Sequence, residues 1–172
     1  CAWATDGSWQ LGRLNLTDGT LQALDVAFSD FDALAVHGDL LVCIAGAVDA
    51  AAAVIAIDLT EMRITVLRES TGFGFDADYL SLPESIWFNS DDARVHAFFY
   101  PPASATLCAP PGELPPLIVI GHGGPTGATS AVLNGRIQYW TTRGFAVVDV
   151  NYRGSTGFGR AYRDALKGLW GV

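Results

Sequence analysis

Residues 117–125 read Leu-Ile-Val-Ile-Gly-His-Gly-Gly-Pro, and they decide the fold of the second half of the chain. The apolar run 117–120 predicts a buried strand that leads directly into a glycine-rich turn. A helix-length segment around residues 131–142 closes at Gly144, and residues 145–150 form another strand-like apolar run. Strand, helix and strand in this order, with continuous apolar strands, predict a βαβ unit of a parallel sheet.

The turn at residues 121–124 stands where open α/β sheets bind ligands, at the carboxyl end of a strand. Dinucleotide binding would need Gly-x-Gly-x-x-Gly and an acidic residue after the next strand, a place that Asp149 fills. The glycine pattern fails, because Thr126 stands at the third glycine position. Acyl transfer fits better, since a His-Gly-Gly turn after a strand presents backbone N–H groups to the oxyanion of a tetrahedral intermediate.

The N-terminal part carries an internal repeat, in which residues 11–25 align with residues 54–68 at an offset of 43. Apolar and polar residues alternate in both copies, as in β-hairpins, with Asp18-Gly19 and Glu61-Met62 at the turns. A strand-only period of about 40–45 residues is typical of β-propeller blades. Chance similarity of two amphipathic hairpins is the alternative.

Residues 40–57 are apolar apart from Asp49, so they approach the length of a membrane span. An Asp in the middle of such a span costs about 2.5–3.5 kcal/mol on insertion, and the segment is rich in Ala and Gly. Two buried strands, 40–48 and 53–58, with a turn at Asp49 fit better. We therefore expect no membrane contact.

Residues 77–112 are expected to contain a linker and a hairpin, with strands at 85–89 and 95–100 and a turn at Asp91-Asp92. Six of the eight prolines lie in residues 101–116, which predicts a surface connection.

The chain of 172 residues has 10 Lys and Arg against 18 Asp and Glu, a net charge of −8 that argues against nucleic-acid binding. Its three cysteines form no Cys-x-x-Cys pair, so neither a disulfide framework nor a zinc site is expected, and we expect them to be small buried residues. The start has neither Met nor a secretion signal, which suggests a truncated chain and, with the odd cysteine count, a cytoplasmic location.

Three motifs together resemble the prolyl oligopeptidase family of serine peptidases, especially its dipeptidyl aminopeptidase and acylaminoacyl-peptidase branches. They are Gly-His-Gly-Gly-Pro at 121–125, Asn-Tyr-Arg-Gly-Ser-Thr-Gly-Phe-Gly-Arg at 151–160, and Trp170-Gly171. Members join an N-terminal β-propeller to a C-terminal α/β-hydrolase domain. The resemblance is dense over residues 113–172 and softer from about residue 81.

The resemblance implies a mixed fold, in which the end of an all-β propeller is followed by the N-terminal part of an α/β-hydrolase domain. Residues 1–76 would end the propeller, residues 77–112 would form the linker and opening hairpin, and residues 113–172 would form a truncated βαβ part of the hydrolase domain.

The resemblance also implies roles for single residues. The amide of Gly124, with that of Gly123 as the alternative, would supply one oxyanion donor. His122 would order the turn by hydrogen bonding, since the catalytic His of this family lies near the C-terminus. Tyr152 and Arg153 would either pack or line the substrate cleft, and Arg153 would be able to pair with a carboxylate.

Ser155 imitates a nucleophile elbow but lacks the glycine two residues earlier, where Arg153 stands. No other serine has both flanking glycines. Because the triad of α/β hydrolases runs Ser, acid, His, the resemblance implies that all three lie beyond Val172. The chain alone should therefore be inactive.

The resulting prediction is a part of a serine peptidase that hydrolyses short peptides through an acyl-enzyme, with the propeller restricting access. Its partner would be a peptide substrate, and no metal or organic cofactor is implied. Two alternatives stay open: an α/β hydrolase that is not a peptidase, such as an esterase, and a non-catalytic binding module.

Overall fold

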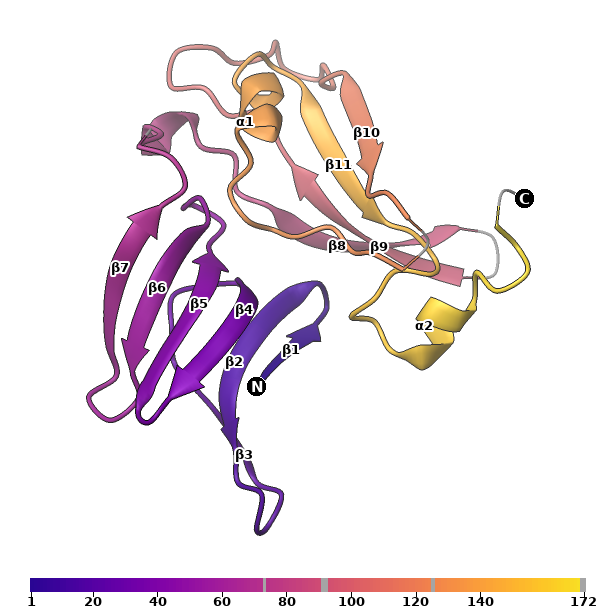
Figure 1. Ribbon diagram of the computed structural model, residues 1–172. Coiled ribbons are helices and arrows are strands. Elements are labelled where there is room, and N and C mark those ends of the chain that lie inside the picture. The colour runs from indigo at the N-terminus through magenta and orange to yellow at the C-terminus, as the bar shows by residue number, and fades with distance from the viewer. Residues whose placement is uncertain (73, 91–92, 125, 171–172) are drawn as a thin grey trace. The chain divides into compact units, whose positions relative to one another are not determined.

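The computed structural model describes residues 1–72, 74–90, 93–124 and 126–170, and it consists mostly of β-strands (Figure 1). The chain divides into two compact units. One comprises Cys1–Phe73 with Ala131–Leu133, and the other comprises Gly74–Ser130 with Asn134–Val172.

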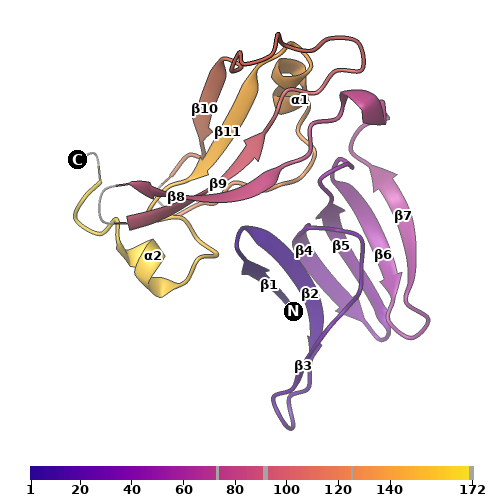
Figure 2. The same cartoon turned by 180° about the vertical axis from the view of Figure 1, so that it is seen from behind.

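The first unit contains two antiparallel sheets, seen from behind in Figure 2. The three-stranded sheet consists of β1 (Ala2–Thr5), β2 (Ser8–Leu14) and β3 (Leu21–Ala23). The four-stranded sheet consists of β4 (Asp30–His37), β5 (Leu40–Gly46), β6 (Ala53–Asp58) and β7 (Arg63–Glu69). The two strands predicted from the apolar segment are thus confirmed as β5 and β6, which pair side by side. Their buried residues form most of the core of this unit.

The predicted repeat has the same strand register in both copies. In the first hairpin Gly12 pairs with Ala23 and Leu14 with Leu21. In the second, Ile55 pairs with Val66 and Ile57 with Ile64, so every partner is displaced by the predicted offset of 43. Both hairpins are confirmed, and they share one register, as copies of a structural repeat must.

The second turn lacks a glycine, but like the first turn it is stabilised by a side chain. The Asp58 carboxylate accepts hydrogen bonds from the backbone N–H groups of Thr60 and Glu61, at 2.9 and 3.0 Å. These hydrogen bonds hold the pKa of the Asp58 carboxyl below its usual value, and the positive charge of Arg63 lowers it further. Asx bonds of this kind occur in both turns, and Met62, at the place of Gly19, adopts a similar positive φ of +53°.

The second unit contains one mixed sheet in the order β10-β11-β9-β8. Its elements are the 3-10 helix η1 (Ala77–Tyr79), the strands β8 (Glu84–Ser90), β9 (Ala93–Tyr100), β10 (Leu117–Gly121) and β11 (Ala146–Asn151), and the helices α1 (Gly135–Thr141) and α2 (Arg160–Asp164). Strands β10 and β11 are parallel, as predicted, and the other pairs are antiparallel. The hairpin of β8 and β9 is confirmed, whereas its predicted turn at Asp91-Asp92 lies outside the described residues.

The prediction that residues 117–120 are buried is wrong. Leu117 is 55% exposed and Val119 is 63% exposed. These side chains are exposed because β10 lies at the edge of the sheet. Among the strands of the described chain it pairs only with β11. The other strand of the pair, β11, has neighbours on both sides and is largely buried.

The predicted helix also begins too early. Helix α1 begins at Gly135 because the Asn134 side chain caps it, accepting a hydrogen bond from the backbone N–H of Arg136. Residues 131–133 belong to the first unit, where the Leu133 N–H donates to the Ala47 carbonyl. The end was predicted better, since Gly144 adopts a φ of +86° two residues after the C-cap Thr142.

The cysteine prediction holds only for Cys43, which is buried in β5, while Cys1 and Cys108 are exposed. Both exposed cysteines lie outside the strands and helices, where no packed core surrounds them. Within the described residues, no helix combines the length and apolar character that crossing a membrane requires.

Replacing Ile55 by Ala should destabilise the first unit strongly, because Ile55 is fully buried between strands. We expect a loss of about 2–5 kcal/mol in the free energy of unfolding, measured by urea denaturation. Val36→Ala is the matched control, since Val36 is 63% exposed on β4 and its truncation should stay within about 0.5 kcal/mol. Equal losses in both variants would contradict this assignment of the core.

Candidate functional site

The candidate site lies where the two parallel strands end. Gly121, the last residue of β10, pairs with Val150 of β11, so the loops that follow both strands leave the sheet at the same edge. We call residues 122–124 the glycine turn and residues 152–159 the return loop. Ligands bind at this edge in open α/β sheets.

His122 begins the glycine turn and contacts the return loop. Its Nε2 lies 2.7 Å from the Ser155 Oγ, and its ring stacks on the Tyr152 ring with 4.4 Å between centroids and 16° between planes. The Ser155 hydroxyl donates to the Tyr152 carbonyl at 2.7 Å, so it accepts from His122. Ser155 is fully buried.

Tyr152 also contacts the backbone of the glycine turn. Its hydroxyl donates to the Gly124 carbonyl at 2.6 Å and lies 3.0 Å from the His122 carbonyl. The side chain therefore spans from the end of β11 to both ends of the glycine turn.

Gly123 and Gly124 are both exposed, and a Cβ at either position would meet open space. Gly124 adopts a φ of +70°, which favours glycine. No described residue accepts a hydrogen bond from the N–H of Gly123 or Gly124. The turn thus offers two backbone donors with a clear approach from solvent.

The sequence reasoning did not single out Gly127. A Cβ there would stand 2.9 Å from the His122 Nδ1 and 3.1 Å from the Gly123 carbonyl oxygen, closer than side-chain atoms allow. Its own carbonyl accepts a hydrogen bond from the Thr156 N–H at 2.9 Å. Its position shortly after the His-Gly-Gly motif could have indicated this contact, since glycine permits close approach of the backbone.

Thr129 joins the two loops a second time. Its N–H donates to the Asn151 Oδ1 at 2.7 Å, and its hydroxyl donates to the Asp149 carboxylate. Burial raises the pKa of Asp149, while the Thr129 hydrogen bond and the nearby His122 act in the opposite direction. Asp149 is thus a buried residue that holds Thr129, rather than an open ribose-binding carboxylate.

The Asn151 side chain connects Thr129 to His96 of β9. Because the Thr129 N–H can only donate, the Asn151 Oδ1 faces it and the amide nitrogen faces the His96 Nδ1, at 3.1 Å. The His96 Nε2 then lies 2.9 Å from the Ser85 Oγ. His96 is fully buried and contacts the Phe158 ring of the return loop, with 4.7 Å between centroids.

Arg153, the remaining residue of the predicted site, is exposed. Within the described residues it forms no ion pair, so the carboxylate partner considered from the sequence is not found. In the same part of the chain no group of three His, Cys, Asp or Glu side chains is placed to hold a metal ion.

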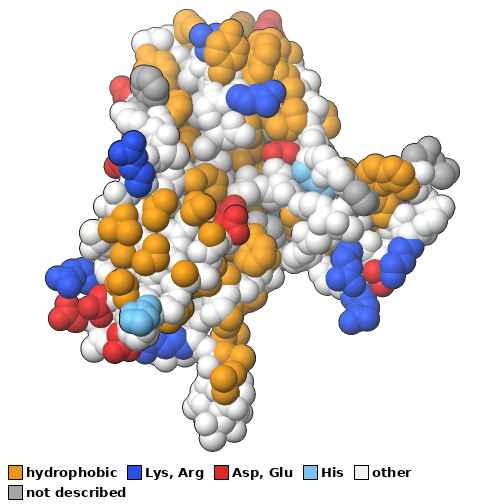
Figure 3. Space-filling view, viewed as in Figure 1, with side chains coloured by type: hydrophobic (Ala, Val, Ile, Leu, Met, Phe, Trp, Pro, Cys, Tyr) orange, Lys and Arg blue, Asp and Glu red, His pale blue; other side chains and the backbone are white. Residues whose placement is uncertain are grey.

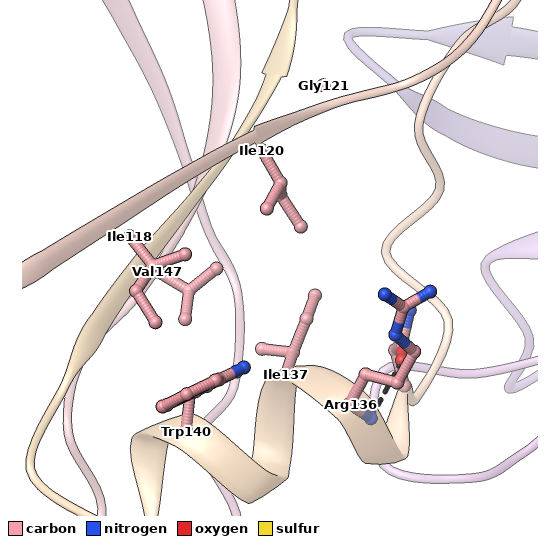
Figure 4. Close-up of a pocket in the computed structure, with 8 residues that line it drawn as sticks. Ile118, Ile120, Gly121, Arg136, Ile137, Trp140 and Val147 are labelled. Atoms are coloured by element: carbon pink, nitrogen blue, oxygen red, sulfur yellow. Dashed lines mark hydrogen bonds between the residues drawn. The ribbon is translucent and has the colours of Figure 1, made fainter.

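A groove of about 270 Å³, lined by apolar side chains and by Asn134 and Arg136, lies between β10 and α1 in the second unit. Ile118, Ile120 and Val147 from the strands face Ile137 and Trp140 from the helix (Figure 4). The groove continues to Gly121, the residue from which the glycine turn begins.

Comparison with known proteins identifies relatives of this chain. Residues 131–172 match the family model described as the prolyl oligopeptidase family. A dipeptidyl aminopeptidase BIII from Pseudoxanthomonas mexicana is 46% identical over 95 residues, which are 54% of this chain and 11% of that protein.

Two solved structures match almost the whole chain. A puromycin-hydrolyzing peptidase from Mycobacterium tuberculosis superimposes with a TM-score of 0.93 at 39% identity, covering 99% of this chain and 27% of that one. A puromycin hydrolase gives a TM-score of 0.89 at 38% identity, covering 99% and 26%. The chain thus spans about a quarter of the length of these peptidases. Residues 131–172 thus match the prolyl oligopeptidase family, and almost the whole chain is similar in fold and sequence to these puromycin-hydrolysing peptidases.

Proposed function

We propose that this chain is part of a serine peptidase that hydrolyses short peptides through an acyl-enzyme, and that it supplies the oxyanion-binding turn. The observation that carries the proposal is the exposed glycine turn at the carboxyl end of a parallel strand, whose Gly123 and Gly124 N–H groups donate to no described residue. The relatives support amide hydrolysis, because they are named as a dipeptidyl aminopeptidase and a puromycin-hydrolyzing peptidase.

In the proposed reaction, a serine outside these residues attacks the substrate carbonyl while a histidine base takes its proton. Negative charge then develops on the carbonyl oxygen. The Gly124 N–H, with that of Gly123 as the near alternative, donates to this oxygen, and one such donor is worth about 10²–10³ in kcat. The histidine afterwards returns the proton to the leaving amine, and water releases the acyl group.

The geometry of Ser155 and His122 supports a nucleophile outside the chain. Ser155 is fully buried, and its hydroxyl proton is donated to the Tyr152 carbonyl instead of to a base. His122 correspondingly serves to order the turn. We therefore expect the 172 residues alone not to cleave peptidyl chromogenic substrates.

We further propose that residues 1–76 are the end of a β-propeller, residues 77–112 a linker and opening hairpin, and residues 113–172 the first part of an α/β-hydrolase sheet. The shared hairpin register supports the blade assignment. Figure 3 shows hydrophobic side chains spread over the surface of the β4–β7 sheet, as expected of a blade whose neighbours would cover it. The propeller would restrict the cleft to peptides, and we propose no metal or organic cofactor.

The esterase alternative shares the same oxyanion turn, since ester and amide hydrolysis pass through similar tetrahedral intermediates. The names of the relatives favour amides, and they also disfavour a non-catalytic binding module.

Replacing Gly124 by Ala in the full-length peptidase should lower kcat about 100-fold, because a Cβ at a φ of +70° forces the turn and its N–H out of position. The matched control is Gly19→Ala, since Gly19 has a φ of +75° and equally open surroundings in the β2–β3 turn. This control imposes the same backbone strain and should leave kcat unchanged. Similar kcat values for the two variants would argue against the oxyanion role.

Amide hydrogen exchange tests the hydrolase assignment. If a further strand pairs with β10 in the full-length protein, the β10 amides that point away from β11 should exchange slowly there and quickly in the 172-residue chain. The amides of β11, which has a partner on each side, serve as the internal control. Equally fast exchange of the β10 edge in both proteins would show that no strand covers it.

A further inference from the structure

Tyr152 has a set of contacts that packing alone does not require. One face of the ring stacks on His122, and the hydroxyl reaches beyond the stack to the backbone of the glycine turn. It lies 2.6 Å from the Gly124 carbonyl oxygen and 3.0 Å from that of His122. One phenol group thus contacts the first and the last carbonyl of a three-residue turn.

These two contacts restrict the peptide group between them. In a trans peptide the N–H points opposite to the preceding C=O, so a fixed His122 carbonyl also fixes the direction of the Gly123 N–H. The Gly124 carbonyl is held at the other end of the turn. The central peptide group, which carries the Gly124 N–H, is therefore bounded on both sides by anchored groups.

His122 holds the turn from one side, since its Nδ1 lies 3.2 Å from the Gly123 carbonyl oxygen, and Tyr152 is the group that reaches the Gly124 end. Both glycines are exposed, a Cβ at either would meet open space, and glycine has the widest backbone freedom of any residue. If the turn were mobile, ordering its N–H donors would add to the free-energy barrier of the reaction. Donors that are already held in place avoid this free-energy cost.

Tyr152 is itself held in place. Its backbone carbonyl accepts the Ser155 hydroxyl proton at 2.7 Å, and the Ser155 Oγ meets the His122 Nε2 at 2.7 Å. The contacts therefore form a closed circuit from Tyr152 to the glycine turn, from His122 to Ser155, and from Ser155 back to Tyr152. Ser155, which is buried and unsuited to attack, has a structural place in this circuit.

We propose that the Tyr152 hydroxyl is a positioning group that presets the oxyanion donors of the glycine turn. This proposal rests on the proposed function. It assigns Tyr152 a role that acts through Gly123 and Gly124, without contact to the substrate. Loss of the hydroxyl should weaken binding of the transition state and leave binding of the substrate nearly unchanged.

The test is Tyr152→Phe in the full-length peptidase, because phenylalanine keeps the ring on His122 and removes only the hydroxyl. We expect kcat for a peptide substrate to fall about 10- to 100-fold, the effect of a small misplacement of catalytic groups, with KM within about twofold of the wild type. The inhibition constant of a peptide aldehyde, whose adduct with serine carries an oxyanion, should rise by the same factor as kcat falls. Tyr139→Phe is the matched control, since Tyr139 is 51% exposed on α1 and no described residue bonds its hydroxyl.

A second variant tests the circuit. Ser155→Ala releases the Tyr152 carbonyl, so it should lower kcat with KM preserved, and it also carries the test if Tyr152→Phe folds poorly. Because both changes act on the same turn, the double variant should lose less than the product of the two single losses.

Three results would overturn the proposal. One is a Tyr152→Phe enzyme with the kcat of the Tyr139→Phe control. Another is a loss of thermal stability without a rise in the aldehyde inhibition constant, which would mark a purely structural role. The third is full multiplicativity in the double variant. Failure of the proposed function can be told apart from failure of the positioning role. In the first case the wild-type protein itself would neither cleave peptides nor react with a fluorophosphonate, and the positioning role would be excluded as well.

Discussion

The parallel pairing of β10 with β11 is the constraint on which the site depends. Because Gly121 lies opposite Val150, the two following loops begin next to each other although 30 residues separate their first positions, His122 and Tyr152. Contacts between them are then short, from Tyr152 to the glycine turn, from Ser155 to His122 and from Thr156 to Gly127. A slip of the register by one residue would turn every side chain of β10 to the opposite face and separate these partners.

Beneath the loops, the second unit buries polar side chains that an apolar core would avoid. The buried side chains of Asp149, Asn151 and His96, with the half-buried Thr129 and the exposed Ser85 at the two ends, connect the edge of the sheet to β8 and β9. Burial disfavours the Asp149 carboxylate, as its raised pKa indicates, so the network costs some stability. Its benefit is geometric, because side chains joined by several hydrogen bonds have few alternative arrangements and give the loops next to them a fixed base.

Alternating and continuous apolar runs in the sequence correctly predicted individual strands and hairpins. The hairpins of the repeat, β5 and β6, and the parallel strands all follow from alternation or apolar runs in the sequence. The exposure of β10 was not predicted. Its apolar run is typical of a buried parallel strand, but the run does not indicate whether a further strand pairs with β10. The start of α1 was missed because residues 131–133 are held by a contact with Ala47, far away in sequence.

The sequence indicated which residues form the candidate site but not the contacts between them. The motif marked Gly123, Gly124, His122 and Tyr152, but nothing in it states that the Tyr152 hydroxyl reaches the Gly124 carbonyl, or that Gly127 must lack a side chain beside His122. Such contacts depend on the distance between two loops, which the strand register sets.

The central claim is that these residues supply the oxyanion turn and that the nucleophile is another serine. Its most direct test is to label the full-length protein with a fluorophosphonate and to locate the modified residue by peptide mass spectrometry. We expect one labelled serine outside residues 1–172, within a Gly-x-Ser-x-Gly sequence. Modification of Ser155, or of any other serine within residues 1–172, would contradict it.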